Sequence, residues 1–279
     1  MTEPTPGVIS NLPEPEYHAH WALSQSLAKH ILAPGCPALV KHLREKGEEP
    51  KAVWEFGTAA HKRVLGVGQE VRYVQAKDWK TKKAQEEGAA ARAAGAIPLL
   101  EEKRGVIEGM EKAIRDHPVA SALLDPKFGK PEQSLFAQDP ETGIWLRSRL
   151  DWLRDPSANR LLLVDYKTTK CAHPAVFVKD VVNLGYHFQF TFYRMMAILL
   201  GLDPNPAALF VAQEKTPPYL VSVSQLPEEL IEKGDQLNRK AIDLYADCLE
   251  RDEWPGYDEN ITVLETPGWY RYQLEQDES

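Results

Sequence analysis

The segment LLLVDYKT, residues Leu161 to Thr168, decides the fold because it joins four consecutive aliphatic residues to an acid and a base. Such an aliphatic run is typical of a short strand that is buried on both faces of a sheet. Side chains alternate between the faces of a strand, so Asp165 and Lys167 point the same way, about 7 Å apart along the chain. Charged side chains are rare in such a strand unless they have a partner or a function. The segment therefore predicts a central strand that carries a site.

A second strand precedes this one in the sequence. Ile144 to Leu153 alternates polar and apolar residues, which places Arg147, Arg149 and Asp151 on one face. If the two strands pair through the short turn between them, Asp151 and Asp165 converge. Two carboxylates at close range repel each other unless a cation neutralises them, and their oxygens suit Mg²⁺ or Mn²⁺. The pattern predicts a divalent-metal site; the alternative is an exposed ladder of salt bridges across a hairpin.

The order of the expected elements is that of a mixed α/β fold. Short segments bounded by turn residues predict a three-stranded meander, and segments with helical spacing and further strands follow it. The expected elements are strands over residues 132–138, 144–153 and 161–168, a helix over 185–200, strands over 207–213 and 219–223, and a helix over 228–251. These elements predict a mixed sheet flanked by helices.

The N-terminal part of the chain is expected to be mostly helical, up to about residue 125. Ser24 is a typical helix cap, and further helices are expected over 37–43, 54–65, 77–94 and 98–115. Residues 1–16 hold four prolines and few apolar anchors, which predicts a mobile arm. We expect one domain over residues 17–279, with a helical part (17–125), an α/β core (126–251) and a C-terminal tail (252–279); a separate N-terminal domain is the alternative.

The composition is that of a folded protein that stays in water. Apolar residues make up 43% of the 279 residues, and the charged 27% occur in short blocks of mixed sign. The longest apolar run near the C-terminal half, 195–200, is far shorter than the roughly 20 residues that span a bilayer. The first residues lack the features of a signal peptide. We therefore expect no membrane span and a cytoplasmic location.

Charge and cysteine content narrow the function classes further. The net charge of −8 and the pI near 5.6 argue against nonspecific adhesion to nucleic acid, although a locally basic groove stays compatible with them. Cys36, Cys171 and Cys248 are widely spaced, which excludes a paired-cysteine zinc module and a disulfide framework. We expect three reduced thiols.

Several motifs follow one another in a fixed order along the chain. They are a histidine at the end of FGTAAH (56–61), Asp151, the DYK motif (165–167), and a QxxxY pair formed by Gln189 and Tyr193, accompanied by DPETG (139–143) and DEWP (252–255). Over about residues 17–270 this set resembles the PD-(D/E)xK nuclease superfamily, and within it the RecE-type exonucleases, the group of exonuclease VIII and its phage relatives. The resemblance implies a restriction-endonuclease-like core with a helical N-terminal elaboration.

The resemblance implies a set of metal ligands. His61, Asp151 and Asp165 would bind Mg²⁺, for which Mn²⁺ would substitute, and the carbonyl of Tyr166 would be a further ligand. A lone histidine in an alanine-rich helix is otherwise more often a packing or capping residue. This chain has Asp165 where many members have Glu, so occupancy by one metal or by two stays open. RecB-like relatives hold an iron–sulfur cluster with four cysteines, and three cysteines leave no such cluster here.

The resemblance also implies catalytic residues outside this ligand set. Lys167 would orient or activate the attacking water and offset the charge on the phosphate. Gln189 and Tyr193 lie at i and i+4 on one helix face and would hold the scissile phosphate or the nucleophile. On their own, these two residues are typical of an ordinary helix surface.

Further candidates come from their position or their charge. Glu132 starts the first core strand and is a candidate additional site residue. Arg147 and Arg149 would either contact phosphate or solvate the sheet. A basic stretch with an aromatic residue gives the remaining DNA-binding candidates, with a solvated helix face as the alternative: Lys77, Trp79 and Lys80.

The resemblance implies a function and its partners. The expected activity is metal-dependent degradation of linear double-stranded DNA from its ends, in the 5′→3′ direction, which exposes a 3′ single strand for recombination by strand annealing. The expected partners are double-stranded DNA ends, a RecT-like single-strand annealing protein and further copies of the chain in a ring-like homo-oligomer. The expected setting is the cytoplasm of a bacterial host, with the gene carried by a phage or prophage. The alternative is a non-catalytic DNA-binding or assembly protein on a nuclease-like fold.

Overall fold

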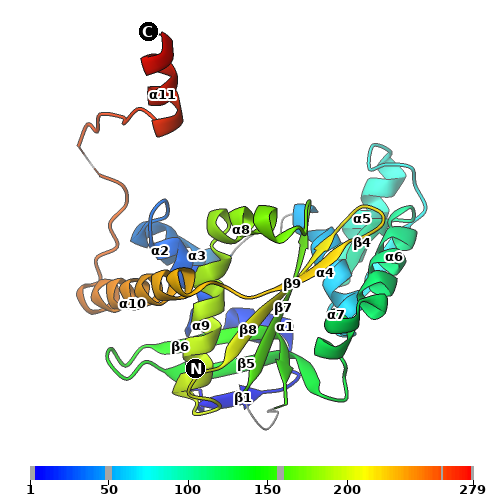
Figure 1. The fold of residues 1–279 in the computed structure, drawn as a ribbon, viewed down its shortest axis with the longest axis horizontal. Coiled ribbons are helices and arrows are strands. Elements are labelled where there is room, and N and C mark those ends of the chain that lie inside the picture. Colours follow the sequence, from blue (N-terminus) through cyan, green and yellow to red (C-terminus); the bar gives the residue numbers. More distant parts are fainter. Residues whose placement is uncertain (1–3, 48–51, 156–159, 259, 278–279) are drawn as a thin grey trace.

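A mixed sheet lies at the centre of the computed structural model, which describes residues 4–47, 52–155, 160–258 and 260–277 (Figure 1). Its strand order is β1-β5-β6-β7-β8-β9, with β2 alongside β6. The strands are β1 (Gly7–Ile9), β2 (Leu23–Ser24), β5 (Gly129–Gln138), β6 (Trp145–Arg154), β7 (Leu162–Thr169), β8 (Ala207–Glu214) and β9 (Val221–Ser224). Neighbours are antiparallel except for the parallel pairs β7–β8 and β2–β6. The α/β class and the mixed sheet are confirmed.

The three strands expected as a meander pair in sequence order. β5 and β6 form a long hairpin, in which Gln138 faces Trp145 and Gly129 faces Arg154. The hairpin turn falls on the DPETG segment, where the backbone N–H of Gly143 donates to the carbonyl of Asp139. The turn expected between β6 and β7 lies mostly outside the described residues.

The pairing of β6 with β7 is short, and this shapes the site. Their ladder consists of Trp152 with Val164 and Leu153 with Leu163. Beyond it, β7 pairs with β8 along its full length. The two strands therefore separate where Asp151 and Asp165 would be the next pair in register.

Helices cover both faces of the sheet and form two apolar cores. One face packs against α2 (Gln25–Ile31), α9 (Tyr186–Leu199) and α10 (Glu228–Arg251), and the other packs against α4 (Ala52–Leu65), α6 (Lys103–Asp116) and α7 (Pro118–Leu123). Successive residues of β7 enter opposite cores, Leu163 the first and Val164 the second. The expectation that this strand is buried on both faces is confirmed.

Local signals placed several helices correctly. The Ser24 hydroxyl accepts a hydrogen bond from the Leu27 N–H at 3.3 Å and caps α2. Pro37 opens α3 (Pro37–Lys46), and α10 has the expected bounds. The polar helix expected from residue 77 begins later, as α5 (Lys82–Ala93), because the Thr81 hydroxyl caps it there.

The N-terminal part holds strands that the sequence analysis missed. A helix was expected from Pro98, but residues 97–100 form β4 (Ile97–Leu100), which pairs in parallel with β3 (Val71–Val74), and the helix starts at Lys103. All four side chains of β4 are buried, so tertiary packing decided the conformation of this apolar run. Where an arm was expected, β1 extends the sheet along β5, and α1 (Glu14–Ala19) follows. Strand pairing at an edge uses backbone groups and needs few apolar side chains.

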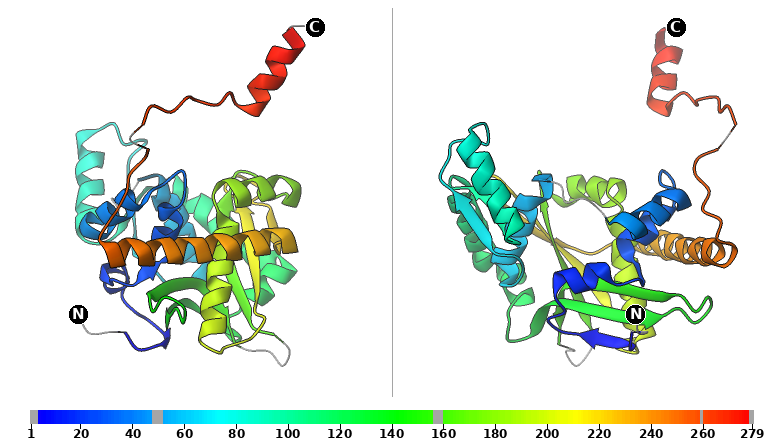
Figure 2. Two further views of the ribbon diagram at one scale, coloured as in Figure 1. Left: turned by 90° about the vertical axis from the view of Figure 1, so that its left-hand side faces the viewer. Right: turned by 180° about the vertical axis from the view of Figure 1, so that it is seen from behind.

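Two further helices differ from the expected pattern. α8 (Pro174–Asn183) precedes α9, and Gly185, with φ of 69°, separates the two helices. α11 (Gly268–Asp277) projects away from the sheet and its helices (Figure 2). No helix among the described residues has the length and apolar character needed to cross a membrane.

Candidate active site

Asp151 and Asp165 lie on adjacent strands at the point where β6 and β7 separate. The backbone N–H of Tyr166 donates to Asp151 Oδ2 at 2.9 Å, so this carboxylate takes the place of a ladder hydrogen bond. Asp165 is buried, with 5% of its surface exposed. Burial raises the pKa of Asp151, and it raises the pKa of Asp165 to about 6 against the opposing effect of Lys167. The charged forms of these two carboxylates, which we call the acidic pair, are therefore destabilised by burial.

Lys167 supplies the positive charge next to this pair. Its Nζ lies 2.8 Å from Asp165 Oδ2 and 4.8 Å from the centroid of the Tyr186 ring. Burial lowers the pKa of Lys167, but Asp165 and Asp151 outweigh burial and raise it above its ordinary value. Lys167 is therefore a cation at neutral pH, held between a carboxylate and an aromatic face.

His61 reaches the same place from α4. Ala59 and Ala60 are fully buried, and they fix this helix against the second core. His61 Nδ1 lies 3.5 Å from Asp151 Oδ2, and its ring meets the Tyr166 ring edge to face, with centroids 5.0 Å apart. Burial, aided by Lys167, lowers the pKa of His61 to about 4. The imidazole is neutral at pH 7, which is the form that binds metals.

The chemistry of these donors fits a divalent cation. Both carboxylate oxygens of Asp165 are buried, and among the described residues it is Lys167, with Nζ 2.8 Å from Oδ2, that compensates their charge. A small void of about 10 Å³ adjoins Asp165, Gln189 and Tyr193, near the lower limit for one water molecule. No group of three or more His, Cys, Asp or Glu side chains among the described residues is already arranged to hold a metal. A cation at this position would compensate the buried carboxylate that the protein itself leaves incompletely paired.

The QxxxY pair lies on α9, above the void. Gln189 Nε2 donates to the Tyr193 hydroxyl at 2.7 Å. Burial, followed by the charges of Asp165 and Asp151, raises the pKa of Tyr193 well above its ordinary value. Tyr193 therefore stays protonated and presents a neutral hydroxyl to the site.

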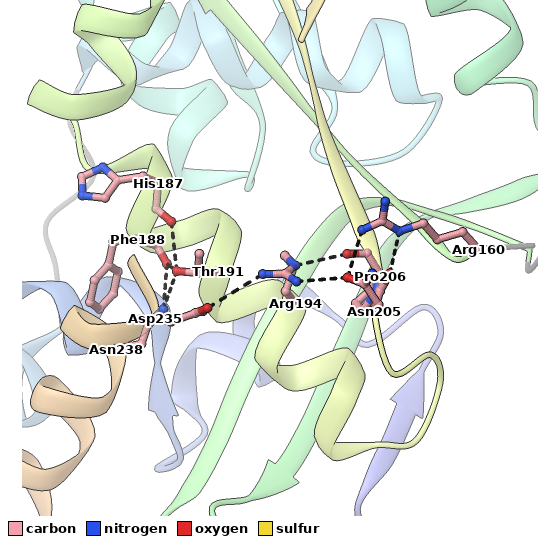
Figure 3. Close-up of polar contacts among 9 residues, drawn as sticks. All are labelled: Arg160, His187, Phe188, Thr191, Arg194, Asn205, Pro206, Asp235 and Asn238. Atoms are coloured by element: carbon pink, nitrogen blue, oxygen red, sulfur yellow. Dashed lines mark hydrogen bonds and ion pairs between the residues drawn. The ribbon is translucent and has the colours of Figure 1, made fainter. Parts of the chain in front are cut away.

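The opposite side of α9 is fixed to α10 (Figure 3). Asn238 Nδ2 donates to Thr191 Oγ1 at 2.7 Å and to the carbonyl of Phe188 at 3.2 Å. Gly234 permits this close packing, because a Cβ there would lie 2.5 Å from Thr191 Oγ1. Arg194 forms an ion pair with Asp235 at 3.8 Å. These contacts hold α9 in place and so fix the position of the QxxxY pair.

Glu132 faces the acidic pair from β5. It stands opposite Asp151 in register, but the ladder skips this position and Glu132 has φ of 51°, in the left-handed region. Its carboxylate lies 3.8 Å from Arg149. Burial, followed by the charge of Asp151, raises the pKa of Glu132 to about 7. A non-glycine residue held in this conformation is typical of a functional site.

One cavity of about 890 Å³ collects most of these side chains, and we call it the first cavity. The predicted site residues that line it are His61, Glu132, Arg149, Asp151, Lys167 and Tyr193. Asp165 and Gln189 lie behind its wall, beside the small void. The side chain of Tyr166 points into the second core, where its hydroxyl donates to Gln213 at 2.5 Å, while its ring packs against His61 and its backbone N–H faces Asp151.

The two arginines of β6 have different environments. Arg149 lines the first cavity and donates to Ser134 and to the carbonyl of Leu12. Arg147 is buried, with 4% exposed, and it donates to the carbonyls of Tyr17, His18 and Ala22. The burial of Arg147 does not fit the solvation alternative: its guanidinium anchors the N-terminal segment. A phosphate contact by Arg147 stays a prediction.

The basic stretch before α5 lies outside the first cavity. The Trp79 ring packs against Gly88, and Arg92 lies 6.0 Å from its centroid. Lys77 and Lys80 are exposed, and Lys80 lies 3.8 Å from Asp78. The solvated alternative suits the two lysines, and the tryptophan is used for packing.

The sequence analysis missed two aromatic residues at the site. Tyr186 lies under Lys167, and Tyr17 lies between the sheet and the first cavity, with Arg149 4.3 Å from its ring centroid. Tyr186 follows Gly185, which is a turn signal at the start of a helix. Tyr17 had no such signal, because only the tertiary structure brings α1 to β6.

Comparison with known families identifies the family of this chain. Residues 24–267 match a family described as a PDDEXK-like domain of unknown function (DUF3799). The chain belongs to this family. The matched range contains every site residue that was predicted from the sequence, from His61 to Tyr193. The comparison with curated proteins found no match.

Comparison with solved structures gave matches at low sequence identity. A candidate exonuclease from Eubacterium rectale matches with a TM-score of 0.59 and 10% identity, over 92% of this chain and 94% of that chain. A phage-related exonuclease from Haemophilus somnus matches at 15% identity (TM-score 0.33; 70% of this chain, 95% of that chain). An alkaline exonuclease from Laribacter hongkongensis matches at 13% identity (TM-score 0.25; 72% and 97%). At 10% identity, the match to the Eubacterium rectale structure shows that the two proteins have a common fold.

Proposed function

We propose that this protein is a metal-dependent exodeoxyribonuclease that degrades linear double-stranded DNA from its ends. One observation carries the proposal: a buried carboxylate, Asp165, and a half-buried one, Asp151, lie where β6 and β7 separate, with Lys167 at 2.8 Å from Asp165 and a neutral His61 at 3.5 Å from Asp151. Membership in a PDDEXK-like family supports this chemistry.

The proposed metal ligands are the side chains of His61, Asp151 and Asp165 and the carbonyl of Tyr166. Magnesium is the expected ion and manganese the expected substitute, since carboxylate and carbonyl oxygens dominate this set. When bound, such an ion supplies charge for the phosphate and lowers the pKa of a bound water. Its binding would also compensate the burial, and the nearby charge of Asp151, that raise the pKa of Asp165.

The remaining roles belong to side chains that do not bind metal. Lys167, a fixed cation, would place the attacking water and offset the charge that builds up on the phosphate. Gln189 and Tyr193 would orient the scissile phosphate or the nucleophile, because α9 is fixed against α10. Glu132 and Arg149 face the same cavity and would adjust the charge there, with Arg149 as a phosphate contact.

We base the proposed direction of degradation and the proposed partners on the order of motifs in the sequence. His61, Asp151, the DYK motif and the QxxxY pair match the RecE-type pattern, so we propose 5′→3′ degradation that leaves a 3′ single strand. A RecT-like annealing protein would take up this strand, and a ring of identical subunits would enclose the DNA. A ring suits an acidic chain, because an acidic exterior repels DNA while a basic channel admits it.

The test is a comparison of DNA forms and labelled ends. Linear duplex should be lost in Mg²⁺ and preserved in EDTA, whereas a covalently closed circle should persist in both. A 5′-labelled duplex should release its label before a 3′-labelled one. Loss of the closed circle at the same rate would refute the exonuclease assignment, and earlier release of the 3′ label would refute the direction. Tight binding without cleavage in any metal would favour the non-catalytic alternative.

A further inference from the structure

A second cavity of about 1100 Å³ opens beside the first. Seven residues line both cavities, including Ser24 and Ser26 at the start of α2 and Thr58 on α4. The second cavity continues from this shared boundary toward α3 and the C-terminal end of α10. The two cavities are therefore parts of one groove that begins at the candidate active site.

The second cavity is cationic in an acidic protein. Five Lys and Arg side chains line it against four carboxylates, whereas the whole chain has 33 basic and 41 acidic residues. The basic residues are Lys41, Arg44, Lys46, Arg92 and Arg147. The charge of this cavity is opposite in sign to that of the whole chain. The cavity is therefore a locally basic groove of the kind that is compatible with a net charge of −8.

Among these cations, Arg44 is exposed and is held in position by aromatic rings. Arg92 forms an ion pair with Glu55 at 2.6 Å, and Lys41 forms one with Asp252 at 3.4 Å. Arg44 is exposed, and the part of the chain that the structure describes gives it no carboxylate partner. Its guanidinium lies 5.4 Å from the ring centroid of Tyr245 and 5.7 Å from that of Trp254. The aromatic rings orient Arg44 and leave its N–H groups available to an anion.

Aromatic rings accompany the cations along the cavity wall. Trp21 and Trp254 are half-buried lining residues, and the His20 ring stacks beside Trp21 with centroids 5.6 Å apart. Trp254 belongs to the DEWP segment, for which the site chemistry has no other use. Cations that follow a groove and aromatic rings that accept bases are the features with which proteins bind single-stranded nucleic acid.

We infer that the second cavity binds single-stranded DNA as it passes to or from the first cavity. This inference rests on the proposed function, because that function makes DNA the polymer at the active site. Arg44 contacts a phosphate, and Trp21 and Trp254 provide surfaces for bases. The binding is independent of sequence, since stacking and phosphate contacts read no base edges.

The test measures binding of a short fluorescent oligothymidylate to the full chain in EDTA, so that no cleavage occurs. Arg44→Ala should weaken binding roughly tenfold, the scale of a lost charge-assisted hydrogen bond. The slope of log affinity against log salt, measured between about 50 and 200 mM, should fall by roughly 0.7 for one lost phosphate contact. Arg44→Lys should restore the slope, because it restores the charge.

A matched control separates this site from general electrostatics. Arg72→Ala removes an exposed arginine of β3 outside both cavities and should leave affinity and slope unchanged. Wild-type affinity in Arg44→Ala, or an equal loss in Arg72→Ala, would overturn the inference. Weaker binding by Arg44→Ala with an unchanged salt slope would also overturn it, since that result indicates a structural role.

The two proposals fail in different experiments. Absence of metal-dependent cleavage by the wild type would end the exonuclease assignment, while the Arg44 effect in EDTA would still establish the groove. Cleavage of linear duplex combined with unchanged oligonucleotide binding by Arg44→Ala would keep the enzyme and remove the groove.

Discussion

The contacts of Asp139 in the DPETG turn let us predict how much its removal lowers the free energy of unfolding. Asp139 is buried, with 2% exposed, and its carboxylate accepts hydrogen bonds from Arg239 at 2.8 and 3.0 Å and from Thr142 at 2.7 and 2.9 Å. Arg239 comes from α10, so this ion pair joins the β5–β6 hairpin to the helix that fixes α9. Asp139→Ala therefore removes both a turn and a tertiary contact.

The expected cost of Asp139→Ala follows from what it leaves behind. Breaking a buried ion pair costs about 3–5 kcal/mol when the remaining charge has no partner. Arg239 keeps Asp243 at 2.7 Å and is 30% exposed, which places the loss at the lower end, about 3 kcal/mol. For a protein of this size we expect Tm to fall by roughly 6–12 °C.

The loss of stability caused by Asp139→Ala should become smaller as the pH falls. Burial raises the pKa of Asp139, but hydrogen bonds from Arg239 and Thr142 outweigh burial and hold it below its ordinary value. The folded state then binds this proton more weakly than the unfolded state does. The stability that Asp139 contributes is present above about pH 4 and is lost as the pH falls through the lowered pKa.

Urea unfolding of the wild type, Asp139→Ala and Glu141→Ala in EDTA provides the measurement. Glu141 lies 3.6 Å from the same arginine but is 71% exposed, so its removal should change the free energy of unfolding by less than about 0.5 kcal/mol. Equal effects of the two substitutions at pH 7 would refute the reasoning, as would a difference that persists undiminished at pH 3.

Three further predictions concern the proposed chemistry. Asp165→Ala should lower the cleavage rate at least a thousandfold while leaving the circular dichroism spectrum unchanged, because several kcal/mol of transition-state stabilisation are lost at about 1.4 kcal/mol per factor of ten; more than a tenth of the wild-type rate would contradict its role. Lys167→Ala should lower the maximal rate about a hundredfold without weakening metal binding. His61→Ala should weaken metal binding, and excess Mn²⁺ should restore part of its cleavage rate. If calorimetric metal titrations show the reverse pattern, the roles assigned to Lys167 and His61 are wrong. Calcium should support DNA binding with little turnover, because it accepts more ligands at longer distances; calcium turnover equal to that in magnesium would count against the proposed geometry.

Much of the site was predictable because a strand has a simple period. Alternation along residues 161–168 places Asp165 and Lys167 on one face, and the structure brings them to 2.8 Å. Hairpin register likewise predicted that Asp151 and Asp165 would converge. These are local consequences of backbone geometry, and they need no knowledge of the rest of the chain.

Other features depend on contacts between distant segments, which a local pattern does not encode. The apolar run 97–100 forms a strand only because β3 lies beside it, and Arg147 is buried because α1 folds over β6. The left-handed conformation of Glu132 and the second cavity also depend on contacts between distant segments. The sequence determined the periodicity of the strands, the caps and the chemical groups of the site; the tertiary structure decided which groups lose water and meet, because burial and long-range pairing depend on all the packed elements together.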